Sequence, residues 1–406
     1  MEAVGEYGGL NLEHTRAIAD MPGGYTEFQD GDVVVAKITP CFENGKAALA
    51  RELVNGAAYG TTELHVLRAG PTLDRGFLFY VAVSDRFRKL GESEMYGAGG
   101  QKRVPPEFNK DFPFPVPSLP EQQQIAAFLD WKTGQIDVLR ARKQELLEKF
   151  KERRVAIITQ VVTRGLNPAV PLRDSGIPWI GQVPRHWEVG GFTKYVEDRA
   201  DYRGKTPEKV RDGVFLVTAK NIKSGAIDYA ISEEFVREDE YSKIMSRGLP
   251  RLGDLVFTTE APLGEVANID REDIALAQRV IKFRGEPLKL NNYFAKYWMM
   301  SAPFQAHLRS LATGSTALGI KASKLFALRC VVPPLDEQLS IVAFLDGKRT
   351  EFSRMEDAVA EAIDRLIEYR AAIITAATTG KIDVRHVEIP VAALDGANVE
   401  SLNYIP

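Results

Sequence analysis

The chain has 406 residues, of which 45% are hydrophobic and 26% are charged, enough for two to four ordinary globular domains. No apolar run reaches the roughly 18 residues that a bilayer span needs, and the first residues lack the basic and apolar regions of a secretion signal. We therefore expect a cytoplasmic protein without membrane contact. The net charge of −3 does not favour nucleic-acid binding, because such binders usually carry a basic excess.

Residues 1–116 are typical of a mixed α and β domain with many turns. The segment GDVVV at 31–35 predicts a turn followed by a buried strand. Aromatic and small residues then recur at helical spacing: Phe77, Tyr80, Ser84 and Phe87. The glycine-rich segment YGAGGQKRV follows and ends at Val104.

Residues 117–170 predict a long helix. Prolines precede it, and Glu121 is the kind of acidic residue that favours a first turn. Apolar residues keep a heptad phase along it: Ile136, Leu139, Leu146, Phe150 and Ile157. Gly134 is expected to break this helix after a short first segment.

Residues 171–332 predict a second mixed domain. It opens with IPWIGQVPRHWEV at 177–189 and RADYRGKTP at 199–207. A second turn and strand follow in GDLVF at 253–257, and the helical aromatic pattern returns: Phe294, Tyr297, Ser301 and Phe304. The segment ATGSTALGI, which ends at Ile320, is the second glycine-rich loop.

Residues 333–385 predict a second long helix, with Glu337 in its first turn and a possible break at Gly347. Its apolar seam favours helix pairing over packing on a sheet. The seam consists of Phe352, Met355, Val359, Ala362, Leu366, Tyr369 and Ile373. Residues 386–406 form a short tail without an assigned role.

The two halves repeat one plan. PSLPEQQQIAAFLD from Pro117 matches PPLDEQLSIVAFLD from Pro333 without a gap, and AIIT recurs in both helices. Two such helices in one chain most simply pair as an antiparallel coiled coil. The predicted fold class is therefore α+β, with two mixed α/β domains separated by two long paired helices.

The first half has no counterpart of the opening segment of the second. We expect a start assigned too far downstream. Genuine loss of the segment, or an intact half that works with a second copy, remain alternatives.

Motifs of catalysis are missing from the sequence. GKT at 204–206 lacks the earlier glycine of a phosphate-binding loop, because position 199 is arginine. The histidines are scattered, without a metal or nucleophile motif. Cys41 and Cys330 are far apart, so they are expected to be buried apolar residues rather than a disulfide or zinc ligands.

These motifs together make the chain resemble the specificity (S) subunit of type I restriction-modification systems. The resemblance rests on PEQQQIAAFLD and LDEQLSIVAFLD, the two AIIT helices, IPWIGQVPRHWEV with GKTP, and GDVVVAKI with GDLVFTTE. It covers nearly the whole chain. By this resemblance, residues 1–116 and 171–332 are two target-recognition domains, the first one shortened.

The resemblance implies a subunit without catalytic activity or cofactor of its own. Each recognition domain would read one half of a bipartite site in double-stranded DNA. The helices would form a spacer and dock methyltransferase (M) subunits, which use S-adenosylmethionine to methylate adenine at N6. A restriction (R) motor subunit that uses ATP and Mg would complete the assembly.

Polar and cationic residues on the loops are the types that contact phosphates and base edges. The expected DNA contacts are Gln101, Lys102, Arg103, Arg203, Lys205, Lys220, Asn221, Lys223, Ser315 and Thr316. The expected docking residues for partner subunits are Glu121, Gln122, Phe128, Glu337, Gln338 and Phe344. The alternatives are a coiled-coil scaffold that does not bind DNA, a remnant of such a subunit and, more distantly, a metal nuclease.

Overall fold

The computed structural model describes residues 1–17, 23–98, 100–204, 207–314 and 318–390. The chain divides into two compact units. Unit 1 consists of Met1–Glu145 and Ala358–Pro406, and unit 2 consists of Leu146–Asp357. We predicted the helical regions 117–170 and 333–385 as segments separate from the two domains. In the structure, each unit contains one half of each long helix, because the helix ends pack into the cores of the units.

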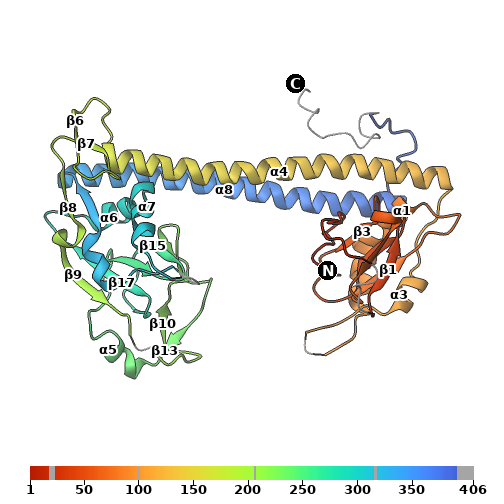
Figure 1. Cartoon of the computed structure of the whole chain (residues 1–406), viewed down its shortest axis with the longest axis horizontal. Coiled ribbons are helices and arrows are strands. Elements are labelled where there is room, and N and C mark those ends of the chain that lie inside the picture. Colours follow the sequence, from red (N-terminus) through yellow and green to blue (C-terminus); the bar gives the residue numbers. More distant parts are fainter. Residues whose placement is uncertain (18–22, 99, 205–206, 315–317, 391–406) are drawn as a thin grey trace. The chain divides into compact units, whose positions relative to one another are not determined.

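The two long helices are α4 (Leu119–Arg164) and α8 (Leu335–Thr378) (Figure 1). Both continue through Gly134 and Gly347, so the expected breaks are wrong. Among the described residues, no atom outside the neighbouring helix backbone lies within 4 Å of the position that a Cβ would take at either glycine. A glycine inside a helix costs only about 1 kcal/mol, less than the packing of so long a helix supplies.

The helix halves pair in antiparallel fashion within each unit. In unit 2, the rings of Phe150 and Phe352 lie 6.2 Å apart, while Gly165 lies beside Glu337. In unit 1, Arg370 Nη1 donates to Asp137 Oδ1 at 2.6 Å. The predicted coiled coil is confirmed, although the seam is uneven: Phe352 and Ile373 are buried, whereas Leu139, Leu146 and Tyr369 are 45%, 38% and 53% exposed.

Unit 1 is built on a sheet in the order β3-β2-β5 and a two-stranded sheet β1-β4. The strands are β1 (Thr26–Gln29), β2 (Val33–Ala36), β3 (Ala47–Leu49), β4 (Ala57–Gly60) and β5 (Leu64–Leu67). The helices are α1 (Arg75–Val83), α2 (Asp85–Ser93) and α3 (Pro106–Asp111), with a 3-10 turn at Val54–Gly56. The fully buried β2 is the strand predicted after Gly31 and Asp32.

Unit 2 contains a sheet in the order β15-β14-β17-β9 and smaller sheets β13-β10-β16, β11-β12, β18-β8 and β6-β7. Its strands are β6 (Leu172–Asp174), β7 (Gln182–Pro184), β8 (Glu188–Gly191), β9 (Val196–Asp201), β10 (Val214–Val217), β11 (Ile222–Lys223), β12 (Ala226–Ile227), β13 (Phe235–Val236), β14 (Leu255–Thr259), β15 (Leu263–Asn268), β16 (Ile274–Leu276), β17 (Val280–Gly285) and β18 (Arg329–Val332). Its helices are α5 (Tyr241–Ile244), α6 (Asn292–Met300) and α7 (Ala302–Leu311), with 3-10 turns at Phe192–Tyr195, Glu238–Glu240 and Ala322–Ala327.

The two units share a frame. Strand β2 pairs with β3 and β5 as β14 pairs with β15 and β17, in each case antiparallel. The aromatic pattern forms the helix pairs α1–α2 and α6–α7, and Ser84 and Ser301 are the residues between the helices of each pair. The repeat read from the sequence is therefore a repeat of structure.

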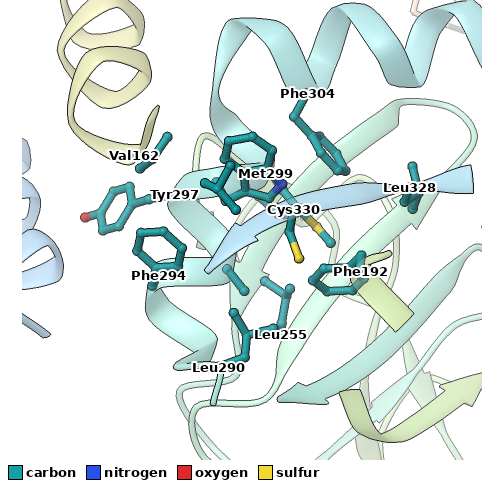
Figure 2. Packing of buried hydrophobic residues seen from close by; sticks show 14 of the residues in the cluster. Val162, Phe192, Leu255, Leu290, Phe294, Tyr297, Met299, Phe304, Leu328 and Cys330 are labelled. Carbon is teal, nitrogen blue, oxygen red and sulfur yellow. The ribbon is translucent and has the colours of Figure 1, made fainter. Parts of the chain in front are cut away.

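The core of unit 2 packs α6 and α7 against the sheets (Figure 2). Phe294, Met299 and Phe304 surround Cys330 of β18, and burial raises the pKa of its thiol. Cys330 thus occupies the apolar position expected of it. Cys41 is only half-buried.

A buried glutamine ties each globular part to the start of a long helix. Gln122 Oε1 accepts from the backbone N–H of Asp74 at 2.7 Å, and its Nε2 donates to the carbonyls of Thr72 and Pro117. Gln338 repeats this pattern with the N–H of Asn291 and the carbonyls of Lys289 and Pro333. Asp74 and Asn291 are the N-caps of α1 and α6.

A threonine from the end of the other helix completes each attachment. Thr375 of α8 accepts from the N–H of Asp85 in unit 1, and Thr159 of α4 accepts from the N–H of Ala302 in unit 2. These N–H groups belong to the first residues of α2 and α7, and the first N–H groups of a helix have no partner within it. The start of one long helix and the end of the other therefore hold each unit.

Replacing Gln122 by alanine should destabilise the chain by roughly 3 kcal/mol, because buried backbone groups lose their partners. The matched control is Gln123→Ala, which changes the exposed neighbour of the same type. The measurement is urea unfolding followed by circular dichroism. Equal midpoints for the two variants would contradict this role of Gln122.

Candidate nucleic-acid interface

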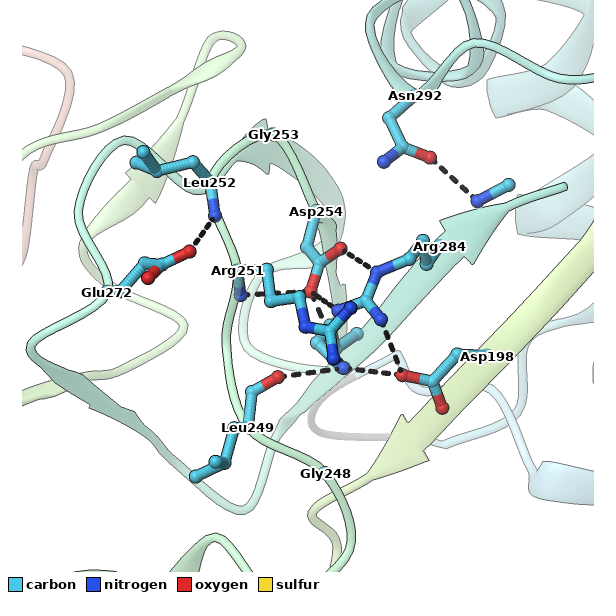
Figure 3. A network of polar contacts seen from close by, with 12 residues as sticks. Asp198, Gly248, Leu249, Arg251, Leu252, Gly253, Asp254, Glu272, Arg284 and Asn292 are labelled. Atoms are coloured by element: carbon cyan, nitrogen blue, oxygen red, sulfur yellow. Dashed lines mark hydrogen bonds and ion pairs between the residues drawn. The ribbon is translucent and has the colours of Figure 1, made fainter. Parts of the chain in front are cut away.

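The Gly-Asp turns before β2 and β14 have a structural role. Asp254 is 1% exposed, and its Oδ2 accepts from the backbone N–H of Arg251 at 3.0 Å (Figure 3). Arg284 of β17 donates Nε and Nη2 to this carboxylate, each at 2.7 Å. The fully buried Lys282 donates to Asp198 Oδ2 at 2.8 Å and to the carbonyl of Leu249.

Unit 1 has the same turn with fewer charges. Arg68 of β5 donates to both oxygens of Asp32, at 2.7 and 2.8 Å. These hydrogen bonds hold the pKa of the Asp32 carboxyl below its ordinary value. The two turns therefore fix the start of the central strand, which leaves the strand end and its loops as the variable side.

At the end of each central strand, a glycine-rich loop returns to the turn that follows the strand. Ile38 and Arg103 form an isolated bridge in unit 1, and Glu260 and Gly319 form the corresponding bridge in unit 2. Arg103 also bridges Tyr96, which is 65% exposed. Exposed polar and aromatic side chains are thus carried on backbone that is held by hydrogen bonds.

The residues predicted in the first loop lie together. Gln101 and Lys102 are exposed. Arg103 is partly exposed and directs its guanidinium to Glu63, with Nη2 to Oε1 at 2.8 Å. In unit 2, Lys220 and Lys223 are exposed, near β11.

Two other predicted DNA contacts have internal partners. Asn221 is fully buried: its Oδ1 accepts from Thr218, and its Nδ2 donates to the carbonyls of Asp228 and Ser232. Arg203 donates to both oxygens of Asp201 and to the carbonyl of Ile320. A base contact by Asn221 would break this network. Lys205, Ser315 and Thr316 lie outside the described residues.

An open groove of about 600 Å³ lies beside the bridge of unit 2. Arg203, Thr259, Glu260, Arg279, Thr313 and Lys321 are among the residues that line it. Arg279 and Lys321 were not predicted as site residues, because no local motif marks them. The backbone N–H of Thr259 donates to the carbonyl of Arg279 at 2.9 Å, and this contact brings Arg279 to the loop.

The predicted docking residues separate into buried and accessible groups. Gln122, Gln338 and Phe128 are buried, so they act within the fold. Glu337 Oε2 lies 2.8 Å from His186 Nε2 and accepts from Trp187 Nε1 at 3.0 Å. Phe344 is 39% exposed, and Glu121 is partly exposed.

A groove along α4 in unit 2 was not predicted. It has a volume of about 780 Å³ and is lined by apolar residues that include Val155, Ala156, Trp179, Ile180 and Pro303. Trp179 stacks on His307 with ring centroids 4.3 Å apart. The tryptophan in the sequence IPWIG, Trp179, is the one feature that could have predicted this groove.

The segment after α8 packs on unit 1 as far as it is described. Val384 is 3% exposed, and Gln124 Nε2 donates to the carbonyls of Val384 and Val387. The sequence had given the tail from 386 no role. The start of this segment helps to complete unit 1.

The described residues contain no cluster of three or more histidine, cysteine, aspartate or glutamate side chains that could hold a metal ion. Over the same residues, no helix combines the length and apolar character required to cross a bilayer.

Two related α/β units attached to paired long helices define a duplicated architecture. The family model of the type I restriction modification DNA specificity domain matches the chain over residues 26–148 and 210–354. Because these matches cover more than half of the chain, the protein belongs to this family.

Individual relatives agree with the family match. The EcoAI specificity subunit of Escherichia coli is 50% identical over 107 residues, which are 26% of this chain and 18% of the relative. The EcoEI subunit of the same species is 41% identical over 120 residues, 29% of this chain and 20% of the relative. The matched part thus spans about a fifth of these relatives.

Matches that cover more of the chain have lower sequence identity. The MjaVIII specificity subunit of Methanocaldococcus jannaschii is 26% identical over 330 residues, 78% of this chain and 72% of the relative. A solved chain from a study of the assembly and conformational transition of the type I R-M system has a TM-score of 0.66 at 18% identity. It covers 89% of this chain and 85% of its own length, which shows a shared fold.

Substituting Asp254 with asparagine should destabilise unit 2 by about 3 kcal/mol. Arg284 and Lys282, whose Nζ lies 3.4 Å from Asp254 Oδ2, would lose the buried carboxylate and keep only the more exposed Asp198 as a counter-charge. The matched control is Asp273→Asn, which breaks the exposed pair with Arg271; exposed pairs contribute little. Denaturant unfolding compares the two. A midpoint shift no larger for Asp254→Asn than for the control would refute the structural role of the turn.

Proposed function

We propose that this chain is the DNA sequence-recognition subunit of a type I restriction-modification complex. It reads a bipartite target in double-stranded DNA and positions the adenine-N6 methyltransferase (M) and restriction (R) subunits. The observation that carries the proposal is the double family match, which falls on the two repeated units. The names of the relatives support the same role.

The subunit contributes recognition, and the chemistry belongs to its partners. S-adenosylmethionine, ATP and Mg act in the partner subunits, and the complex acts in the cytoplasm. The loops of both units, including those at the ends of β2 and β14, supply cations for phosphates and forked or amide groups for base edges. Gln101, Lys102 and Arg103 serve one half-site, and Arg203, Lys205, Lys220, Lys223, Ser315 and Thr316 serve the other.

The M subunits dock on the helices. Glu121, Glu337 and Phe344 are the accessible members of the predicted docking set. The apolar groove along α4 adds surface of the kind that the centre of a protein interface buries.

Co-expression with the methyltransferase subunit of the same system, in a host without adenine methylation, tests the proposal. We expect methylated adenines within one bipartite motif, because each unit reads its own half-site. Single-molecule sequencing of genomic DNA gives the motif. The control is the methyltransferase subunit expressed alone.

A palindromic motif would show that only one unit reads DNA. Stable association with the methyltransferase subunit but no methylation would refute DNA recognition by this chain.

A further inference from the structure

An ion pair between arginine and glutamate occurs at the loop junction of unit 1. Arg103 donates Nε to Glu63 Oε2 at 2.9 Å and Nη2 to Oε1 at 2.8 Å. The backbone carbonyl of Glu63 accepts from the N–H of Lys37, the residue after β2. The hydrogen bonds from Arg103 lower the pKa of the Glu63 carboxyl.

Unit 2 has an ion pair at the same junction, with an arginine in the position that Glu63 occupies in unit 1. Arg279 Nε lies 2.8 Å from Glu260 Oε1. Arg279 precedes β17 as Glu63 precedes β5, and its carbonyl accepts from the N–H of Thr259 at the end of β14. Glu260 bridges Gly319 of the second glycine-rich loop. The frame thus keeps an arginine–glutamate pair while the arginine comes from a different element.

The geometry of Arg103 leaves one edge of the guanidinium directed away from Glu63. The Nε and Nη2 groups face the carboxylate, whereas the polar contact of Nη1 is to the carbonyl of Gln101 at the long distance of 3.5 Å. The side chains of Arg103 and Arg279 are 39% and 48% exposed. Exposed ion pairs contribute little to stability, so holding the fold does not account for these two.

A guanidinium held on one edge is suited to guanine. The O6 and N7 atoms of guanine accept two parallel hydrogen bonds in the major groove, and arginine is the commonest partner for them. A carboxylate that fixes the plane of the fork reduces the conformational entropy lost on binding. Lysine carries the same charge on a single ammonium without the rigid planar fork, so it specifies guanine less strictly.

We propose that Arg103 and Arg279 each recognise a guanine, one in each half-site, and that Glu63 and Glu260 are positioning residues for these forks. This inference rests on the proposed function of the chain. It names the base that each unit reads at its loop junction.

Arg103→Lys and Arg279→Lys test the inference in the complex with the methyltransferase subunit. We expect Arg103→Lys to relax the motif at one guanine of one half-site and Arg279→Lys to relax one guanine of the other. Glu63→Gln and Glu260→Gln should weaken the preference at the same two positions, because the forks lose their charged support. Single-molecule methylation maps give the motif of each variant.

Binding to modified DNA gives an independent readout. Placing 7-deazaguanine at the guanine in question removes the N7 acceptor. It should lower the affinity of the wild-type complex about fivefold, because one of the two hydrogen bonds of the forked contact is lost, and change that of the lysine variant less. The matched control is Arg271→Lys, since Arg271 lies near the start of β14 and also pairs with a carboxylate; it should leave the motif unchanged.

An unchanged motif in both lysine variants would overturn the inference, and so would a uniform loss of methylation with the motif intact, which indicates a phosphate contact. The wild-type complex separates this failure from that of the proposed function. If it yields no motif, DNA recognition itself is refuted, and the inference with it.

Discussion

The structure depends on a buried amide at the start of each long helix. A glutamine side chain both accepts and donates, so Gln122 and Gln338 satisfy one backbone N–H and two backbone carbonyls that would otherwise be buried without partners. Leaving such groups unpaired is expensive. The amide therefore fixes where the globular part meets the helix. Thr375 and Thr159 fix the second attachment from the opposite helix.

This arrangement makes each unit dependent on sequence far from its own strands. Unit 1 takes Ala358 onward from the second half of the chain, and the backbone after α8 packs against Gln124. Unit 2 takes the C-terminal half of α4 in the same way. The end of α8, which follows the globular part of unit 2, therefore completes unit 1, and the end of α4, which follows the globular part of unit 1, completes unit 2.

A shared frame with different loops is consistent with the proposed reading of two different half-sites. The buried polar groups at Asp32 and Asp254 are satisfied within the frame, so changes at the opposite end of the central strands leave the fold intact. Many cations are paired with nearby carboxylates, as in Arg103–Glu63, Arg279–Glu260 and Arg237–Asp239. Together with the net charge of −3, this pairing favours short-range contacts over long-range electrostatic attraction to a polyanion.

The duplication, the two long helices, their antiparallel pairing and the family could all be predicted from the sequence. These features follow from local periodicity and from a repeat in register, which need no knowledge of distant contacts. It also gave the strand after each Gly-Asp turn. It placed Gln122, Gln338 and Asn221 among candidate contact residues because amides suit both binding and burial. The expected helix breaks at Gly134 and Gly347 were wrong. The low helix propensity of glycine is outweighed by the packing of a long helix.

The sequence could not show which polar residues are buried within the fold and which face the surface; that depends on the tertiary contacts. Asn221 became a structural residue through contacts with Asp228 and Ser232, and Arg279 reached the loop through a hydrogen bond from Thr259. The shared position of Glu63 and Arg279 likewise depends on strand pairing, because these residues directly precede β5 and β17, which pair with β2 and β14. Burial and pairing are set by residues distant in sequence, and a linear pattern does not contain them.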